Sequence, residues 1–418
     1  GSSRGQRSFR SQAFGELSSR KTSAAGMELA LYPTVGLASG ELANVSWLQE
    51  FPDPVTKICW DNYFCFSIAD AKALKISEGQ MVSVKMGDRT QEGPAHIQPG
   101  QAPGVIGLAV GYGRTRGGKV CDGVGINAFD LAQVDGEHLI TSGLPVEVKA
   151  LAKKHSLACT QGHHSMEGRQ IVVEETLAQF TKNPGGQVHR HKMFSMWEPH
   201  EYKGYKWGMT IDLNSCTGCG SCIIACQSEN NIPTVGKKYV LQGREMHWVR
   251  VDRYYVGDPE NPDTVNQPVI CMHCDNAPCE SVCPVAATVH SDEGTNDMIY
   301  NRCVGTRYCA NNCPYKVRRF NWFSYTDIEA PKHLALNPEV TVRHRGVMEK
   351  CTFCIHRIKF AKMEAKLAGE KVKDGTLKTA CQQSCPTNVF TFGDLNDPES
   401  AVSKAFKEAQ SYELLEEL

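Results

Sequence analysis

The fold of this chain is decided by the stretch CTGCGSCIIAC at residues 216–226. Its four cysteines follow the spacing C-x2-C-x2-C-x3-C, which is typical of bacterial ferredoxins, although Gln227 stands where a proline is usual. Three cysteines in a tight loop can bind three corners of an iron–sulfur cube, while the fourth starts a helix and points toward a second cube. The motif therefore needs a partner motif elsewhere in the chain.

Three more cysteine groups follow downstream and supply such partners. They are CMHCDNAPCESVCP at 271–284, CVGTRYCANNCP at 303–314, and a split group with CTFC at 351–354 and CQQSCP at 381–386. The candidate metal ligands of the four groups are Cys216, Cys219, Cys222, Cys226, Cys271, Cys274, Cys279, Cys283, Cys303, Cys309, Cys313, Cys351, Cys354, Cys381 and Cys385. The chain has 19 cysteines in all, and this odd, one-sided distribution disfavours a disulfide framework.

Zinc is the main alternative metal, because C-x2-C pairs also build tetrahedral zinc sites. Four cysteines within 216–226 crowd too many thiolates for one zinc ion, so the spacing favours iron–sulfur clusters. The third group has only three cysteines, and Thr306 stands where alignment on the first group places another. We therefore predict three [4Fe–4S] clusters and one [3Fe–4S] cluster. A fourth [4Fe–4S] cluster, completed by water or a distant residue, remains open.

Composition excludes several other classes of function. The 418 residues contain 45 Lys and Arg against 46 Asp and Glu, a net charge of −1, which argues against a nucleic-acid partner. No stretch approaches the roughly 18 consecutive apolar residues of a transmembrane helix. Charge is uneven locally, however, since residues 299–326 contain five cations and no acidic residue. We expect a surface for a membrane partner at Arg302, Arg307, Lys316, Arg318 and Arg319.

We expect an α+β protein with three regions. Residues 1–41, which begin with a Ser/Gly/Arg-rich stretch, are a linker or an excerpt of a longer chain. Residues 42–190 contain short strand-like runs separated by Gly and Pro, which favours a small β-barrel. Residues 191–418 form a double ferredoxin-like iron–sulfur domain, with helices expected at 358–367 and 400–418.

Two smaller features allow two interpretations each. His273 lies inside the second cysteine group, where it could donate a hydrogen bond to a cluster sulfur or face solvent. The glycine-rich stretch 111–125 could cradle a pyrophosphate through its N–H groups, or its glycines could only permit tight turns.

Residues 205–390 resemble the four-cluster iron–sulfur subunits of the molybdopterin oxidoreductases, such as DMSO, polysulfide and nitrate reductase. In that family the first cysteine group pairs with the fourth, and the second pairs with the third. The resemblance implies four ligand sets: Cys216, Cys219, Cys222 and Cys385; Cys226, Cys351, Cys354 and Cys381; Cys271, Cys274, Cys279 and Cys313; and, for the three-iron cluster, Cys283, Cys303 and Cys309.

Residues 42–178 resemble a different module, the dinucleotide-binding barrel of molybdopterin catalytic subunits. The matching stretches are WDN at 60–62, HIQPGQ at 96–101, GYGR at 111–114 and GVGIN at 123–127. Fusion of this barrel to the cluster domain is similar to the B subunits of bacterial alternative complex III, which are regarded as lacking the pterin. The resemblance therefore implies a barrel without molybdopterin.

This resemblance also implies a function, which is electron transfer within a membrane-bound quinol oxidoreductase. The expected partners are an integral quinol-binding subunit, multihaem cytochromes c, and a terminal acceptor such as a cytochrome oxidase or a small electron carrier. The expected location is the periplasmic face of the bacterial cytoplasmic membrane. Two alternatives remain: the wire of a molybdenum-dependent reductase for a sulfur or inorganic substrate, and a scaffold whose clusters are only structural.

Overall fold

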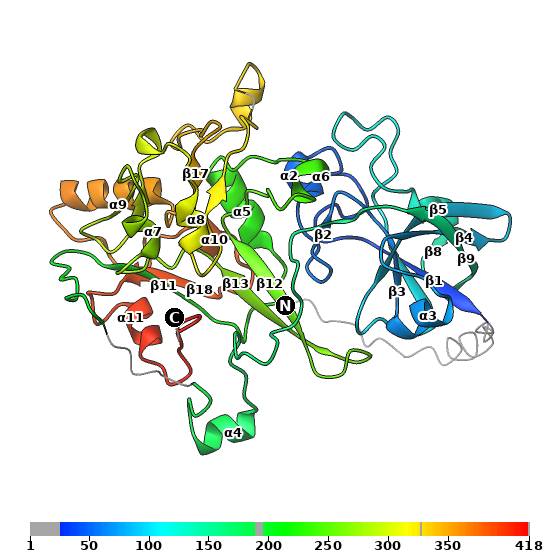
Figure 1. Ribbon diagram of the computed structural model, residues 1–418, viewed down its shortest axis with the longest axis horizontal. Helices are drawn as coiled ribbons and strands as arrows, with labels where there is room; N and C mark the ends of the chain where they lie inside the picture. The colour runs from blue at the N-terminus through cyan, green and yellow to red at the C-terminus, as the bar shows by residue number, and fades with distance from the viewer. Residues whose placement is uncertain (1–25, 189–194, 327, 417–418) are drawn as a thin grey trace, which may run out of the picture.

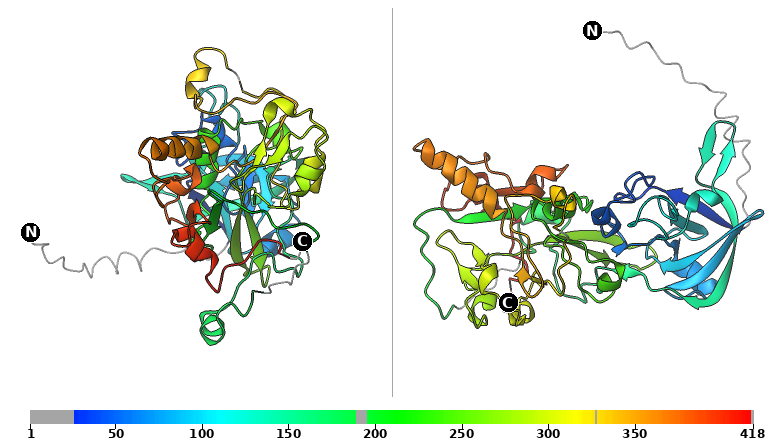
Figure 2. Two further views of the ribbon diagram at one scale, coloured as in Figure 1. Left: turned by 90° about the vertical axis from the view of Figure 1, so that its left-hand side faces the viewer. Right: turned by 90° about the horizontal axis from the view of Figure 1, so that it is seen from above.

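The computed structural model describes residues 26–188, 195–326 and 328–416. These residues form two lobes that lie side by side along the longest axis of the molecule (Figure 1). The first part of the chain, drawn in blue and cyan, forms a strand-rich lobe, and the later part, drawn in green to red, forms the other. The view from above shows the same two lobes (Figure 2).

The first lobe is built on a closed six-stranded barrel with the strand order β1-β6-β3-β5-β4-β9. Its strands are β1 (Met27–Tyr32), β3 (Phe64–Phe66), β4 (Gln80–Met86), β5 (Arg89–Ile97), β6 (Val105–Ala109) and β9 (Leu144–Lys154). Along β4, Val82, Val84 and Met86 are buried while Lys85 is exposed, because successive side chains of a strand point to opposite faces. The inward-pointing side chains fill the barrel.

β1 corrects the expected boundary of this lobe. The linker expected at 1–41 is wrong from Met27 onward, because Met27–Tyr32 runs parallel to β6 and antiparallel to β9 and so closes the barrel. Its six residues carry little local signal, and their partners lie more than 70 positions away in the sequence. The Ser/Gly/Arg-rich stretch at 1–25 lies outside the described residues.

Short elements complete the first lobe and the connection to the second. They are α2 (Ser46–Gln49), β2 (Ile58–Cys59), α3 (Ile68–Ala73), η1 (Ala128–Leu131), β7 (Gln133–Asp135), β8 (His138–Ile140), β10 (Ala158–Cys159) and α4 (Leu177–Lys182). Ser67 caps α3, since its side chain accepts the backbone N–H of Asp70. Thr176 and Gln179 form a capping box at the start of α4.

The second lobe consists of short helices and two-stranded sheets. Its elements are β11 (Trp207–Ile211), α5 (Ser221–Glu229), α6 (Lys237–Val240), β12 (Arg250–Val256), β13 (Asp263–Val269), α7 (Pro278–Ser281), β14 (Thr288–His290), β15 (Asn296–Met298), η2 (Tyr300–Arg302), α8 (Tyr308–Asn312), β16 (Arg319–Phe320), η3 (Lys332–Ala335), β17 (Met348–Glu349), α9 (Ile355–Leu367), α10 (Ala380–Ser384), β18 (Phe390–Asp394) and α11 (Ala401–Phe406). β11 pairs with β18, so the beginning and the end of this lobe close on each other.

Two helix pairs organise this lobe. α5 packs against α10, and α7 packs against α8. Because α7 and α8 lie between α5 and α10 in the sequence, one pair is inserted into the other. A repeated helix pair of this kind agrees with the expected double ferredoxin-like architecture.

The two lobes share a hydrophobic core. Phe51, which follows α2, packs in the same cluster of buried side chains as Ile223 of α5 and Val235. The buried Glu50 carboxylate accepts the backbone N–H groups of Val235, at 2.9 Å, and Gly236, at 2.7 Å. The first lobe therefore packs directly on the helix that carries the first cysteine group.

Of the two helices expected near the C-terminus, one is present over its whole expected range and the other is shorter than expected. α9 includes the whole range 358–367, whereas α11 ends at Phe406 instead of continuing to 418. Beyond α11 the chain turns back, because the Tyr412 hydroxyl donates to Gln267 Oε1 at 3.1 Å and Leu414 packs against the shared core. None of the described helices has the length and apolar character needed to cross a lipid bilayer.

Candidate metal centres

Four short helices position cysteines in the same way. Each has one cysteine in its first turn and a second cysteine four residues later. These pairs are Cys222 and Cys226 on α5, Cys279 on α7 with Cys283 just beyond its end, Cys309 on α8 with Cys313 directly after it, and Cys381 on α10 with Cys385 directly after it. Residues four apart share a helix face and are separated by about 6 Å along the axis. The two ends of each helix can therefore supply thiols to two different sites.

The first set of thiols gathers around the start of α5. Burial, Cys381 and the three other members of the set raise the pKa of the Cys222 thiol above its usual range. Those three members are Cys216, Cys219 and Cys385, the last of which directly follows α10. The structure thus brings three cysteines of the first group to the last cysteine of the fourth.

The second set surrounds a small cavity beside the end of α5. Cys226, Cys351, Cys354 and Cys381 all line this cavity, and all four are buried. Burial and the Cys351 and Cys354 thiols raise the pKa of Cys226 well above its usual range. A buried space walled by four thiols is suited to a cofactor that binds thiolates.

The third set lies at the start of α7. Burial, together with the Cys271, Cys279 and Cys313 thiols, raises the pKa of Cys274 to about 12. The Cys271 thiol also acts electrostatically on Cys351, so the second and third sets are neighbours.

The remaining three cysteines lie beside the third set. Cys309 is buried in a small apolar cluster with Cys279, and the half-buried Cys283 and Cys303 pack against the same cluster. Thr306, at the position of the missing cysteine, is exposed. The small cluster thus holds cysteines of the third set and of the three-cysteine set side by side.

The spacing of these thiols bears on the kind of metal site. Among the described residues, no three His, Cys, Asp or Glu side chains come close enough together to hold a single metal ion. Thiolates bound to one zinc at about 2.3 Å would lie about 3.8 Å from one another. An iron–sulfur cube needs no such tight group, because each thiolate binds a different iron.

Backbone and side-chain amides point at several of the sulfur atoms. Ala287 N donates to Cys283 Sγ at 3.2 Å, Phe353 N to Cys351 Sγ at 3.4 Å, and Ala380 N to Cys354 Sγ at 3.5 Å. Such N–H groups stabilise anionic sulfur and are one of the means by which a protein adjusts the potential of a cluster. The donor set and its surroundings therefore fit iron–sulfur clusters.

His273 is buried and does not face solvent. Its Nδ1 accepts the backbone N–H of Asn296 at 3.0 Å, and its ring stacks on Phe353 with 4.0 Å between the ring centroids. Burial, Lys350 and other cations lower its pKa well below the usual range, so the ring is neutral with its proton on Nε2. Nε2 has no hydrogen-bond partner among the described residues. A buried donor without a partner beside Cys271 and Cys274 fits a cluster sulfur.

The expected cationic surface is wrong for two of its five residues. Arg302, Arg307 and Lys316 are exposed. Arg318 is only 7% exposed, because its guanidinium turns inward and donates to Cys279 Sγ at 3.3 Å. Arg319 is half-buried in an ion pair with Glu245 at 2.9 Å.

The glycine-rich stretch of the first lobe uses its N–H groups internally. The Gly113 N–H donates to Val124 O at 2.8 Å, and the Ile126 N–H donates to Asn62 Oδ1 at 2.8 Å. Gly113 has φ +75°, and a Cβ there would lie 2.1 Å from Asn127 N. This stretch therefore follows the tight-turn interpretation, since these glycines are needed for close backbone approach.

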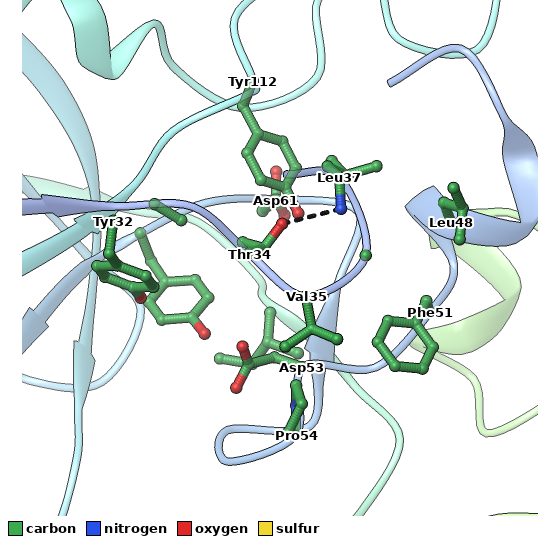
Figure 3. A pocket seen from close by; sticks show the side chains of 14 residues that line it. Tyr32, Thr34, Val35, Leu37, Leu48, Phe51, Asp53, Pro54, Asp61 and Tyr112 are labelled. Atoms are coloured by element: carbon green, nitrogen blue, oxygen red, sulfur yellow. Dashed lines mark hydrogen bonds between the residues drawn. The ribbon is translucent and has the colours of Figure 1, made fainter. Parts of the chain in front are cut away.

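The first lobe also contains a small pocket near the end of β1 (Figure 3). It is lined by Tyr32, Asp53, Asp61 and Tyr112, and by Phe51 on the side of the second lobe. The space open to a water molecule is about 20 Å³, which suits about one water. The pocket is therefore too small for an organic substrate.

Sequence reasoning missed the buried charges around the cysteine groups. Lys350 is fully buried and donates to Cys351 O at 2.9 Å, and Arg343 is buried in an ion pair with Glu349 at 2.8 Å. The sole signal was that Glu349 and Lys350 directly precede the CTFC stretch, where surface charges would be unusual.

Comparisons with known proteins agree with this geometry. Two family models, each described as a 4Fe-4S dicluster domain, match residues 263–328 and 302–389. The iron–sulfur cluster-binding subunit of menaquinone reductase from Nitratidesulfovibrio vulgaris is 43% identical over 221 residues, which cover 51% of this chain and 85% of that protein. A putative dimethyl sulfoxide reductase iron–sulfur subunit from Halobacterium salinarum is 39% identical over 219 residues, covering 50% of this chain and 74% of that protein.

A third relative comes from an archaeon. The Hdr-like menaquinol oxidoreductase iron–sulfur subunit 1 from Archaeoglobus fulgidus is 33% identical over 222 residues, covering 49% of this chain and 76% of that protein. Each of these matches spans about half of this chain. Among solved structures, acetylene hydratase from Pelobacter acetylenicus covers 29% of this chain and 18% of its own at 13% identity, with a TM-score of 0.21 that supports no argument about fold. The chain belongs to the family of iron–sulfur cluster-binding electron-transfer subunits that serve quinone- and DMSO-reductase-type complexes.

Proposed function

We propose that this chain is the electron-transfer subunit of a membrane-bound quinol oxidoreductase of the alternative complex III type. The observation that carries the proposal is the continuous arrangement of the four thiol sets. α5 links the first set to the second through Cys222 and Cys226, and α7 links the third to the last through Cys279 and Cys283. The second and third sets are neighbours, because, besides burial, the Cys271 thiol raises the pKa of the Cys351 thiol electrostatically. Clusters held in this order would form a single wire.

The proposed ligands follow the sets that the resemblance implies. In order along the wire, the sets are Cys216, Cys219, Cys222 and Cys385; Cys226, Cys351, Cys354 and Cys381; Cys271, Cys274, Cys279 and Cys313; and Cys283, Cys303 and Cys309. The first three sets would each hold a [4Fe–4S] cluster, and the last, which has Thr306 in place of a fourth cysteine, a [3Fe–4S] cluster. When bound, such clusters accept and release one electron at a time.

We assign the first lobe a packing role without molybdopterin. Its barrel resembles a dinucleotide-binding module, but N–H groups of the glycine-rich stretch that could hold a phosphate are bonded within the protein, as at Gly113 and Gly123. Its one pocket described above holds about one water. Phe51 and Glu50 instead attach the lobe to the cluster-binding lobe.

The partners are proposed from the family and from the exposed charges. An integral membrane subunit would bind the quinol, since the relatives include subunits of menaquinone reductase and menaquinol oxidoreductase. Arg302, Arg307 and Lys316 lie on the surface beside the three-cysteine set and suit docking to such a subunit. Multihaem cytochromes c and a terminal oxidase or small carrier would take the electrons, on the periplasmic face of the membrane. We propose no nucleic-acid partner.

A second candidate is the wire of a molybdenum-dependent reductase, favoured by the similarity to the dimethyl sulfoxide reductase subunit. One experiment separates these functions: the intact complex is purified without air and assayed for iron, molybdenum, pterin fluorescence, and cluster reduction by added quinol. Iron with quinol reduction and no molybdenum supports the quinol oxidoreductase. Stoichiometric molybdenum or pterin supports the second candidate. Iron that neither quinol nor dithionite reduces would point to a structural scaffold.

A further inference from the structure

Arg318 is a buried cation that has no acidic partner among the described residues. Its Nη2 donates to Thr288 Oγ1 at 2.8 Å, and its Nη1 donates to Asn296 Oδ1 and to Cys279 Sγ, both at 3.3 Å. Nη2 also contacts Met298 Sδ at 3.3 Å, while Nε has no hydrogen-bond partner among the described residues. No ion pair joins Arg318 to a carboxylate anywhere in the described part of the chain.

Two nearby arginines differ from Arg318 in this respect. Arg343 is equally buried, but it forms an ion pair with Glu349 at 2.8 Å, and the adjacent Arg319 pairs with Glu245 at 2.9 Å. A buried guanidinium without an anion is strongly unfavourable, because removing the charge from water is not compensated. The anions available to Arg318 would be the thiolates that bind iron, above all Cys279, whose sulfur accepts a hydrogen bond from it, and Cys309, which packs in the same buried cluster as Cys279.

The two thiols belong to different proposed clusters. Cys279 lies in the first turn of α7 and is a member of the third set, whereas Cys309 lies in the first turn of α8 and is a member of the three-cysteine set. Since α7 packs against α8, the guanidinium that contacts Cys279 also lies close to the site of Cys309. Arg318 therefore lies at the junction between the last two clusters of the wire.

We propose that Arg318 raises the reduction potentials of these two clusters together and so keeps electron transfer between them close to balance. The inference rests on the proposed ligand sets. Reduction adds one electron, and thus one negative charge, to a cluster, and the electron comes from the neighbouring cluster. A cation that donates a hydrogen bond to a ligand sulfur of one cluster, and lies in the same packed region as a ligand sulfur of the other, stabilises the extra charge in either position. Arg318 thus acts on the two clusters through its positive charge and takes no electron itself.

The test is an EPR-monitored redox titration of the intact, anaerobically purified complex that carries Arg318→Gln. We expect the one-electron reduction equilibria of the third and last clusters to shift toward the oxidised state at least tenfold, or 59 mV. The clusters of the first two sets should keep their potentials. Arg319→Gln is the matched control, because its charge is already neutralised by Glu245, and it should shift none of the four potentials by as much as threefold.

Arg318→Lys keeps the charge and is the second variant. It should retain iron at all four sites and keep both affected equilibria within about threefold of wild type. Unchanged potentials in an iron-loaded Arg318→Gln complex, or equal shifts in all four clusters, would overturn the proposal. The proposal would also be overturned if Arg318→Lys kept its iron at all four sites but lowered the potentials of the third and last clusters as much as Arg318→Gln is expected to. A wild-type complex without reducible iron would instead reject the proposed function itself.

Discussion

Replacing Arg343 with methionine should loosen the connection between the end of α5 and the fourth cysteine group. Arg343 forms two charged hydrogen bonds with Glu349, Nε to Oε1 at 2.8 Å and Nη2 to Oε2 at 3.0 Å. The same Nη2 donates to Asn230 O at 2.8 Å. Asn230 ends the helix that carries Cys226, and Glu349 lies two residues before Cys351. The arginine thus ties together the two segments that supply the second set of thiols.

The size of the effect follows from burial. The side chains of Arg343 and Glu349 are each 1% exposed. Removing one partner of a buried ion pair costs about 3–5 kcal/mol, because the other charge stays buried without compensation. Trp248 Nε1 and Asn321 Nδ2 would still donate to Glu349, at 2.9 and 2.8 Å, but neither carries a charge. Local opening at this site should therefore become about a hundredfold to a few thousandfold more frequent.

The assay is the rate at which the visible absorbance of the clusters is lost in moderate urea with an iron chelator, without air. When opening is fast compared with chelation, this rate follows the population of the open state. The matched control is Lys373→Met, which removes an exposed ion pair with Glu370 and should change the rate by about fivefold at most. The double variant Arg343→Met with Glu349→Leu should lose its clusters more slowly than Arg343→Met alone, because both charges of the ion pair are removed and neither is left buried without its partner. Equal rates for Arg343→Met and the control would refute this reasoning.

Three further predictions address the clusters and the contact between lobes. Thr306→Cys should convert the proposed three-iron cluster to [4Fe–4S], so the narrow EPR signal of an oxidised three-iron centre should be present in the wild type and absent from the variant. His273→Phe keeps the stack but removes the Nε2 donor, and redox titration should show a fall in the potential of the cluster at the third set. Burial raises the pKa of Glu50 to about 7 despite N–H donors at Val235 and Gly236. The folded protein therefore favours the protonated Glu50. Because the pKa of an unfolded glutamate is about 4.5, the contribution of Glu50 to the free energy of unfolding is fully present below pH 4.5 and is lost as the pH rises through 7, by up to about 3 kcal/mol. Thermal unfolding at pH 6 and pH 8 should show the loss, and Glu50→Gln, which imitates the protonated acid, should reduce it.

The cysteine groups were accessible to sequence reasoning because cluster binding imposes local spacing. Three cysteines in a loop and one four residues into a helix, as at Cys222 and Cys226, need no knowledge of distant residues. The pairing of groups was not accessible in this way. It depends on α5 packing against α10, whose sequences lie about 150 residues apart, and it came from family resemblance.

Features set by long-range contacts could not be predicted. β1 is a barrel strand because Met27–Tyr32 pairs with β6 and β9, and nothing local distinguishes it from a linker. Arg318 and Arg319 stand together in a run of cations that resembles a solvated surface. Only the folded chain places Arg318 next to Cys279, 39 residues earlier, and Arg319 next to Glu245. The helix expected to reach 418 ends at Phe406, because contacts of Tyr412 and Leu414 override local propensity.

The same packing that builds the second lobe also determines the path of its electrons. Cys226 and Cys381 come from helices near the beginning and the end of the lobe's sequence, so the second set exists only when α5 and α10 are packed. Its thiols are buried, and burial keeps them protonated unless a metal supplies compensating positive charge. Iron binding and closure of the helix pair must therefore stabilise each other. A chain without iron would leave a cavity walled by four thiols at the centre of the shared core, where the first lobe also attaches through Phe51. We therefore expect that loss of iron weakens the contact between the lobes as well as the wire.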